Sequence, residues 1–182
     1  MKLIRWGEAG TERAGLLDDS GTLRDLSGTV TDWSWQTLTS QTLTQVAALD
    51  MNTLPDLPAD TRLGAPVSRP GKIVGCALTY GKHAAEAGLE PPEEPMFMLT
   101  AASAINGPND QVMMPKGGTK LDWEAELAVV FCKAGANIPL ENSMSHVAGF
   151  CVSNDLSERV FQLERGTQWT KGKSADTLKP LG

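Results

Sequence analysis

The chain has 182 residues, enough for one ordinary domain or for a small N-terminal module followed by part of a larger domain. Its hydrophobic content of 41% and charged content of 21% exclude general disorder and fibrous repeats. A net charge of -6, scattered basic residues and no signal-like or long apolar segment lead us to expect a cytoplasmic protein that binds neither nucleic acid nor membranes.

The N-terminal third predicts a small β-containing module. Short strand-like runs are separated by turns that contain glycine, as in a meander of strands. An amphipathic stretch follows, for which Ser40 is available as an N-cap. The strands are predicted at residues 2–6, 14–18 and 22–26, and the helix at residues 40–49.

A proline-rich segment separates this module, residues 1–55, from the rest of the chain. Four prolines between residues 55 and 71 indicate a linker over residues 56–71. Beyond it, continuous apolar runs predict strands buried on both faces, so the fold class is α+β with strands dominant. The strands are predicted at residues 72–78, 96–99, 127–131 and 147–152, and helices at residues 81–87 and 157–165.

The three cysteines are odd in number and lie far apart. Cys76, Cys132 and Cys151 each occur inside an apolar stretch. This pattern is typical of small buried residues in a reducing compartment, so we expect free, buried thiols.

Three acidic residues accompany the predicted strands. Glu124 and Glu126 must point to one face of a strand, about 7 Å apart. A solvated acidic face is one interpretation, but unpaired carboxylates are costly on a strand that continues into a buried run. Asp155 follows the next strand, either as a turn residue or as a third ligand. Three oxygen ligands without nearby His or Cys would suit Mg²⁺ or Mn²⁺ better than zinc.

Two further groups are candidates for acid–base or anion-binding chemistry. His83 and Glu86 lie on one face of a predicted helix, where they form either a water-activating pair or a surface pair. Lys173 lies in a Lys-Gly-Lys segment, and it is either part of a solvated loop, a counter-ion for the acidic cluster or a ligand for a substrate oxyanion.

Five segments taken together resemble the fumarylacetoacetate hydrolase family, in order and at the family's spacing. The resemblance implies that Glu124, Glu126 and Asp155 bind Mg²⁺ or Mn²⁺. It also implies that His83 and Glu86 activate water on a mobile lid. Arg159, Gln162 and Lys173 are implied to contact substrate or the metal shell, with Lys173 also among the catalytic residues. The segments are residues 76–88, 93–110, 122–130, 149–162 and 169–177.

The implied activity is metal-dependent hydrolysis of a C–C bond in a small 2-oxo or 1,3-dioxo acid, such as an acylpyruvate or a diketo-deoxy-sugar acid, through a metal-stabilised enolate. An isomerase, decarboxylase or lyase of related acids is the alternative, as is an inactive fragment. Thr79 departs from the asparagine usual in the family. The implied fold is a mixed β-roll, of which residues 72–182 would be the N-terminal part, and the full-length form is expected to be a homodimer.

Overall fold

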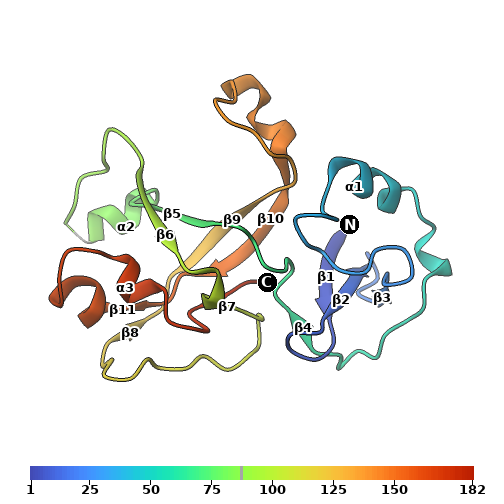
Figure 1. Ribbon diagram of the computed structural model, residues 1–182, viewed down its shortest axis with the longest axis horizontal. Coiled ribbons are helices and arrows are strands. Elements are labelled where there is room, and N and C mark those ends of the chain that lie inside the picture. The colour runs from blue at the N-terminus through green and yellow to red at the C-terminus, as the bar shows by residue number, and fades with distance from the viewer. Residues whose placement is uncertain (87) are drawn as a thin grey trace.

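The structure is a computed structural model that describes residues 1–86 and 88–182. Elements β1 to β4 and helix α1 lie together on one side of the molecule, and the elements from β5 onward lie on the other (Figure 1). We refer to residues 1–70 as the N-terminal region and to residues 71–182 as the C-terminal region. Within the described residues, every helix is too short or too polar to cross a membrane.

The N-terminal region is built on a four-stranded antiparallel sheet with the order β3-β2-β1-β4. Its first three strands confirm the predicted meander. The predicted helix is also present, but its N-cap is Thr39, whose side chain accepts a hydrogen bond from the Thr42 amide at 3.1 Å. The elements are β1 (Lys2–Trp6), β2 (Arg13–Leu17), β3 (Leu23–Asp25), α1 (Ser40–Ala47), a 3-10 turn η1 (Met51–Thr53) and β4 (Leu63–Gly64).

Strand β4 lies within the predicted linker. Residues 56–71 carry prolines, yet Gly64 pairs with Arg5 of β1. Gly64 packs closely against the Glu12 side chain, because an added Cβ would lie 2.8 Å from a carboxylate oxygen of Glu12. The prolines lie outside this two-residue edge strand, where they remove no ladder hydrogen bond, so they do not prevent the pairing.

A closed hydrophobic core fills the space between this sheet and α1. Alternate residues of β2, Ala14 and Leu16, point into it, as the period of a strand requires. Trp33 is fully buried there, and its indole Nε1 donates to the Gly15 carbonyl at 3.2 Å. Val130, from the C-terminal region, packs against the same core. The two regions therefore share an apolar contact.

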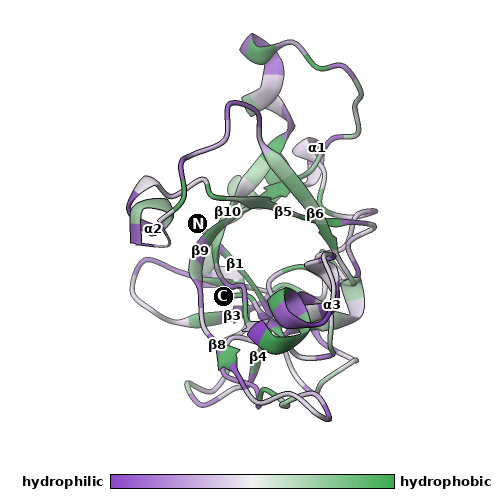
Figure 2. Ribbon diagram, turned by 90° about the vertical axis from the view of Figure 1, so that its left-hand side faces the viewer, coloured by the Kyte–Doolittle hydropathy of each residue, from purple (hydrophilic) through white to green (hydrophobic). Residues whose placement is uncertain are grey.

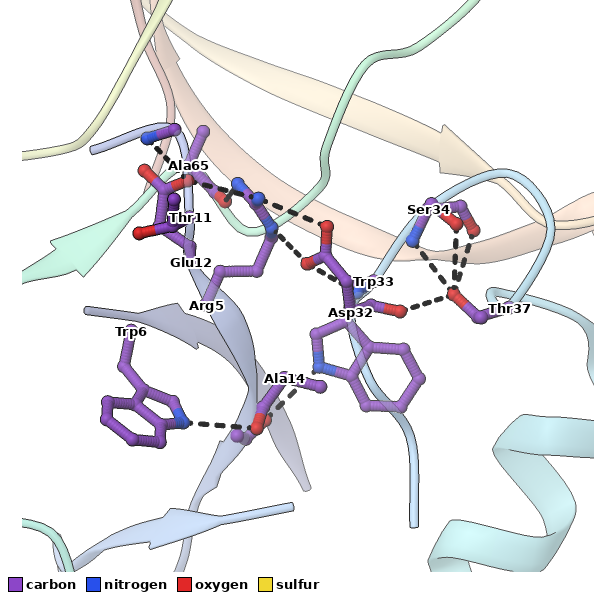
Figure 3. A network of polar contacts seen from close by, with 12 residues as sticks. Arg5, Trp6, Thr11, Glu12, Ala14, Asp32, Trp33, Ser34, Thr37 and Ala65 are labelled. Atoms are coloured by element: carbon purple, nitrogen blue, oxygen red, sulfur yellow. Dashed lines mark hydrogen bonds and ion pairs between the residues drawn. The ribbon is translucent and has the colours of Figure 1, made fainter. Parts of the chain in front are cut away.

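A network of charged side chains also joins the two regions. Figure 3 shows the Arg5 guanidinium between Glu12 and Asp32, at 3.2 Å and 2.5 Å. Arg62 contacts the other oxygen of Glu12 at 3.1 Å and Asp110 of the C-terminal region at 2.5 Å. The Arg62 hydrogen bond lowers the pKa of Asp110 despite the opposing effect of burial. The network keeps these charges paired on both sides of the contact.

The C-terminal region is assembled from paired strands. Those at the predicted positions are β5 (Ile73–Ala77), β6 (Met96–Thr100), β9 (Ala125–Phe131) and β10 (Val147–Asn154), paired antiparallel as β5–β6 and β9–β10. Short antiparallel strands β8 (Leu121–Asp122) and β11 (Ser157–Glu158) pair, and β7 (Ile105–Asn106) pairs in parallel with β12 (Lys179–Pro180). The helical elements are α2 (Gly81–Glu86), η2 (Ala102–Ala104), η3 (Leu140–His146), η4 (Val160–Glu164) and α3 (Thr170–Lys173).

The prediction that the long strands are buried on both faces is wrong. Figure 2 shows hydrophobic residues along β6 and β10, and several of these side chains face solvent. Phe97 of β6 is 70% exposed, and Leu127 and Phe150 are also exposed. The reason is that each of these two sheets has only two strands, and the described residues leave one face of each uncovered. The structure is nevertheless a strand-rich mixture of helices and strands, as the predicted α+β class requires.

Two helices and the cysteines also need correction. The helix predicted at residues 157–165 begins as strand β11, and only residues 160–164 are helical, as a π-helix. The helix predicted at residues 81–87 is present as α2, with Ala87 outside the described residues. The three cysteines are free as expected, but each is only partly buried.

Candidate metal centre

The antiparallel pairing of β9 with β10 brings three carboxylates together. Glu124 immediately precedes β9, Glu126 is its second residue, and Asp155 immediately follows β10. The register places Glu126 opposite Ser153, and the Asp155 amide donates to the Glu124 carbonyl at 2.8 Å. One carboxylate oxygen from each acid lies within 4.8 Å of the other two. The pair predicted from strand periodicity, Glu124 and Glu126, thus lies together, and Asp155 is a buried member of the same group rather than a surface turn residue.

Three cationic side chains surround these carboxylates. The buried Lys173 Nζ donates to Glu124 Oε2 at 2.7 Å and to Asp155 Oδ2 at 2.6 Å. The Arg159 guanidinium contacts Glu124 Oε1 at 2.5 Å. Lys179 Nζ forms an ion pair with Asp155 Oδ1. Lys173 therefore has the geometry of a counter-ion for the acidic cluster. Its burial excludes the alternative that it lies in a solvated loop.

Burial and neighbouring charges shift the pKa values within this cluster. Burial alone would raise the pKa of Glu124, but hydrogen bonds from Lys173 and Arg159 lower it. Glu126 has a raised pKa because of burial and the nearby Glu124 charge. Burial lowers the pKa of Lys173, and it lowers that of Lys179 to about 8. Among the three acids, Glu126 therefore has the negative charge that neighbouring cations stabilise least.

Close packing of helix α3 against η4 positions Lys173. A Cβ added to Gly172 would lie 2.6 Å from Gln162 Cβ and 2.7 Å from the Glu158 carbonyl. Only glycine permits this approach, which turns Lys173 inward while Lys171 stays exposed. The glycine between the two lysines is therefore a packing requirement of the site.

Glu158 anchors the loop beside the cluster. This fully buried carboxylate accepts backbone hydrogen bonds from Thr119 at 2.8 Å and from Lys120 and Phe161 at 2.7 Å. These amides lower its pKa against the opposing effect of burial. Glu158 was missed in the sequence, because its partners are backbone groups in distant segments and leave no local pattern.

Arg159 and Gln162 lie beside the carboxylates and contact each other. Arg159 Nη1 donates to Gln162 Oε1 at 2.8 Å, and its other nitrogens contact Asp122 at 2.6 Å and 3.0 Å. Gln162 is buried. The structure therefore brings both residues to the cluster, and their implied contact with substrate stays a prediction.

Helix α2 places His83, but not Glu86, against the cluster. His83 Nε2 lies 3.9 Å from Glu124 Oε1, and the imidazole is 52% exposed. Glu86 is exposed, and among residues 1–86 and 88–182 no hydrogen bond joins it to His83. The geometry thus links His83 to the carboxylates directly. Thr79, the residue that departs from the family pattern, donates to the Cys76 carbonyl at 3.2 Å.

The donor set fits a hard divalent cation. Three carboxylates converge, one of which is buried and one of which lacks a hydrogen-bonded cation within the described part of the chain. Carboxylate oxygens are the ligands that Mg²⁺ and Mn²⁺ prefer, and three carboxylates at a partly buried site favour bound positive charge. The residues could therefore hold such an ion, in a position now shared with the ammonium groups of Lys173 and Lys179.

Known proteins resemble this chain over its whole length. A Burkholderia ambifaria protein, provisionally named as a hydrolase, is 46% identical over all 182 residues. A solved structure from Mycobacterium smegmatis, provisionally named as an HpcE protein, is 31% identical with a TM-score of 0.81. A 5-carboxymethyl-2-hydroxymuconate delta-isomerase from the same organism is 26% identical with a TM-score of 0.73. Each match covers 100% of this chain and 64% of the other protein.

The site itself lies in the part of the chain that a family model matches. The model is described as the C-terminal domain of fumarylacetoacetate hydrolase, and it matches residues 72–182. This span contains the carboxylates, the cations around them and His83. The chain therefore belongs to the fumarylacetoacetate hydrolase family.

Proposed function

We propose that the protein that contains this chain is a divalent-metal-dependent enzyme that hydrolyses a C–C bond in a small 2-oxo or 1,3-dioxo acid. The chain spans 64% of the length of the relatives it matches. The observation that carries the proposal is the convergence of Glu124, Glu126 and Asp155 beside His83. The hydrolase and isomerase names among the relatives support the class of substrate. An acylpyruvate or a diketo-deoxy-sugar acid is the substrate type we propose.

The cluster residues divide into ligands and counter-ions. Glu124, Glu126 and Asp155 would hold Mg²⁺ or Mn²⁺, which when bound polarises substrate oxygens and stabilises developing negative charge. Lys173 and Arg159 keep the Glu124 carboxylate ionised and fixed in direction. A substrate carboxylate or carbonyl oxygen would meet these cations at the same site.

The proton chemistry is assigned to His83. Its Nε2 faces the carboxylates while half of the ring remains open to solvent, so it can take a proton from a water molecule at the edge of the site. Glu86 lies three residues further along the helix, a spacing from which it can hydrogen-bond the imidazole after a change of rotamer. Lys173, already directed at the cluster, is the proposed oxyanion contact.

Isomerisation is the second candidate reaction. The delta-isomerase from Mycobacterium smegmatis has the same fold at a TM-score of 0.73, and isomerisation needs the enolate but not the attack of water. An assay with an acylpyruvate separates the two, because only hydrolysis releases two acids.

Calorimetric titration of Mn²⁺ tests the site. Replacing the pair by Glu124→Ala/Glu126→Ala should abolish binding, since two of the three ligands are lost. The matched control is Glu93→Ala/Glu94→Ala, which removes the same charge from exposed positions. Equal Mn²⁺ binding in all three proteins would exclude the carboxylate cluster as the metal site.

Turnover of a form with the full length of its relatives tests the role of His83. His83→Ala should lower kcat by about 10² or more, the usual scale for loss of a general base, with Mn²⁺ affinity unchanged. Lys82→Ala, which removes an exposed side chain from the same helix, provides the control. Near wild-type turnover of His83→Ala would remove the imidazole from the mechanism.

A further inference from the structure

Lys179 is a buried cation in the acidic cluster whose position depends on distant strand pairing. Strand β12 pairs in parallel with β7, so that Lys179 lies opposite Ile105, and Leu181 bridges to Ser153 of β10. This arrangement places Lys179 beside the C-terminal end of β10, which Asp155 immediately follows. The Lys179 side chain is only 5% exposed.

The surroundings of its ammonium group are incomplete. Lys179 Nζ is buried and contacts Asp155 Oδ1, and within residues 1–86 and 88–182 it has no conventional hydrogen-bond partner. An ammonium group carries three donors, so a single ion pair leaves most of its capacity unused. Its charge also acts on Glu126 and Glu124, the other two acids of the cluster.

Asp155 is consequently shared between two lysines. Lys173 holds one carboxylate oxygen at 2.6 Å, and Lys179 contacts the other. Arg159 contacts Glu124 and also Asp122, so three positive side chains lie beside the cluster while Glu126 has no direct ion pair among the described residues. Both Asp155 oxygens already contact an ammonium group, so a divalent ion that binds Asp155 must displace one of these groups or share its oxygen, and because β12 fixes Lys179 its charge stays close to the ion.

We propose that Lys179 is a resident cation that competes with a divalent metal ion for Asp155 and thereby sets the metal affinity of the Glu124–Glu126–Asp155 cluster. The inference rests on the proposed metal-dependent function. Its physical basis is that like charges in a buried site are poorly screened, so the ammonium weakens metal binding both by repulsion and by occupying a ligand oxygen. Lys179 is thus an affinity-determining residue rather than a catalytic one.

Mn²⁺ titration calorimetry of the chain at pH 7 provides the test. Lys179→Gln keeps a hydrogen-bond donor beside Asp155 but removes the charge, and it should bind Mn²⁺ at least about tenfold more tightly than wild type, about 1.4 kcal/mol. Lys179→Met should act in the same direction and provides a second neutral variant if one fails to fold. Lys179→Arg keeps the charge and should bind no more tightly than wild type.

The control is Lys171→Met, which removes an exposed lysine from the same helix turn as Lys173. Its Mn²⁺ affinity should equal that of wild type. Binding to Lys179→Gln alone, with none to wild type, would also support the proposal. If wild type binds Mn²⁺ and both neutral variants bind equally or more weakly, the competition is refuted while the metal site stands. If no protein in the set binds Mn²⁺, the proposed function fails as well.

Discussion

The two regions of the molecule differ in what they bury. The N-terminal region buries apolar side chains, with Leu16, Leu26 and Trp33 at 1% exposure or less, and it pairs its charged side chains around the edge of that core. The C-terminal region instead buries Asp155, Glu158 and other polar residues, and it exposes several large apolar side chains. Hydrophobic burial is the main source of folding stability, whereas buried charge is costly unless it is paired or binds an ion.

Two networks built from the same kinds of charged side chain therefore differ in how completely their acids are paired. In the N-terminal network, guanidinium groups contact each carboxylate and fix the contact between the regions. In the cluster at β9 and β10, Glu126 lacks such a partner among the described residues, and burial raises its pKa. Carboxylates with perturbed pKa values are enriched at functional sites.

A tryptophan in each region gives the largest expected contrast. Trp33→Ala should reduce the free energy of unfolding by about 3–5 kcal/mol, because it opens a cavity in a closed core. Trp123→Ala, at a position that is 72% exposed, should change it by less than about 0.5 kcal/mol. Urea unfolding followed by circular dichroism measures both values. Similar costs at the two positions would contradict the comparison.

The paired network at Arg5 should show the next largest effect. Arg5→Met leaves the partly buried Glu12 and Asp32 without their shared cation, although Arg62 still contacts Glu12, at a cost of about 3 kcal/mol. Arg13→Ala removes an exposed arginine that stacks on Trp6 at 5.7 Å, and it should cost less than about 1 kcal/mol. Thermal unfolding of the two variants distinguishes a buried network from a surface contact.

Glu126 should show a smaller effect of opposite sign. Its folded-state pKa is raised above the usual 4.5, so the folded protein favours the neutral acid, and ionisation costs stability as the pH rises through the folded value. With EDTA present, Glu126→Gln should therefore raise the stability at pH 7 by less than about 1 kcal/mol, and the gain should disappear below pH 4.5. Glu94→Gln is the exposed control. A pH-independent difference would assign the effect to packing.

The exposed faces of β6, β9 and β10 provide the smallest effect on folding. Leu127→Ser should change the free energy of unfolding by less than about 0.5 kcal/mol, since the side chain already faces solvent. Large exposed apolar patches mark association sites, and we propose that this face contributes to a homodimer. Light scattering should show weaker self-association for Leu127→Ser than for the exposed, polar control Ser145→Ala. Unchanged association would locate the interface elsewhere.

Much of the local structure could be predicted from the sequence. The short run at residues 2–6 and the continuous apolar runs at 127–131 and 147–152 predicted strands that the structure contains, and backbone pleating gives each strand a period of two. The same period placed Glu124 and Glu126 on one face. What covers a strand lies outside its own residues, and the prediction of two covered faces was wrong for that reason.

The sequence by itself thus determined the strands, the carboxylate pair and the resemblance of five segments to a known family. Only the tertiary structure decided that Asp155 is buried, that His83 faces the cluster and Glu86 does not, and that Lys179 belongs to it. Lys179 has no local signature, because its place follows from the pairing of β12 with β7, more than 70 residues away along the chain. Local patterns record the period of the backbone, whereas a site depends on which distant strands pair and in what register.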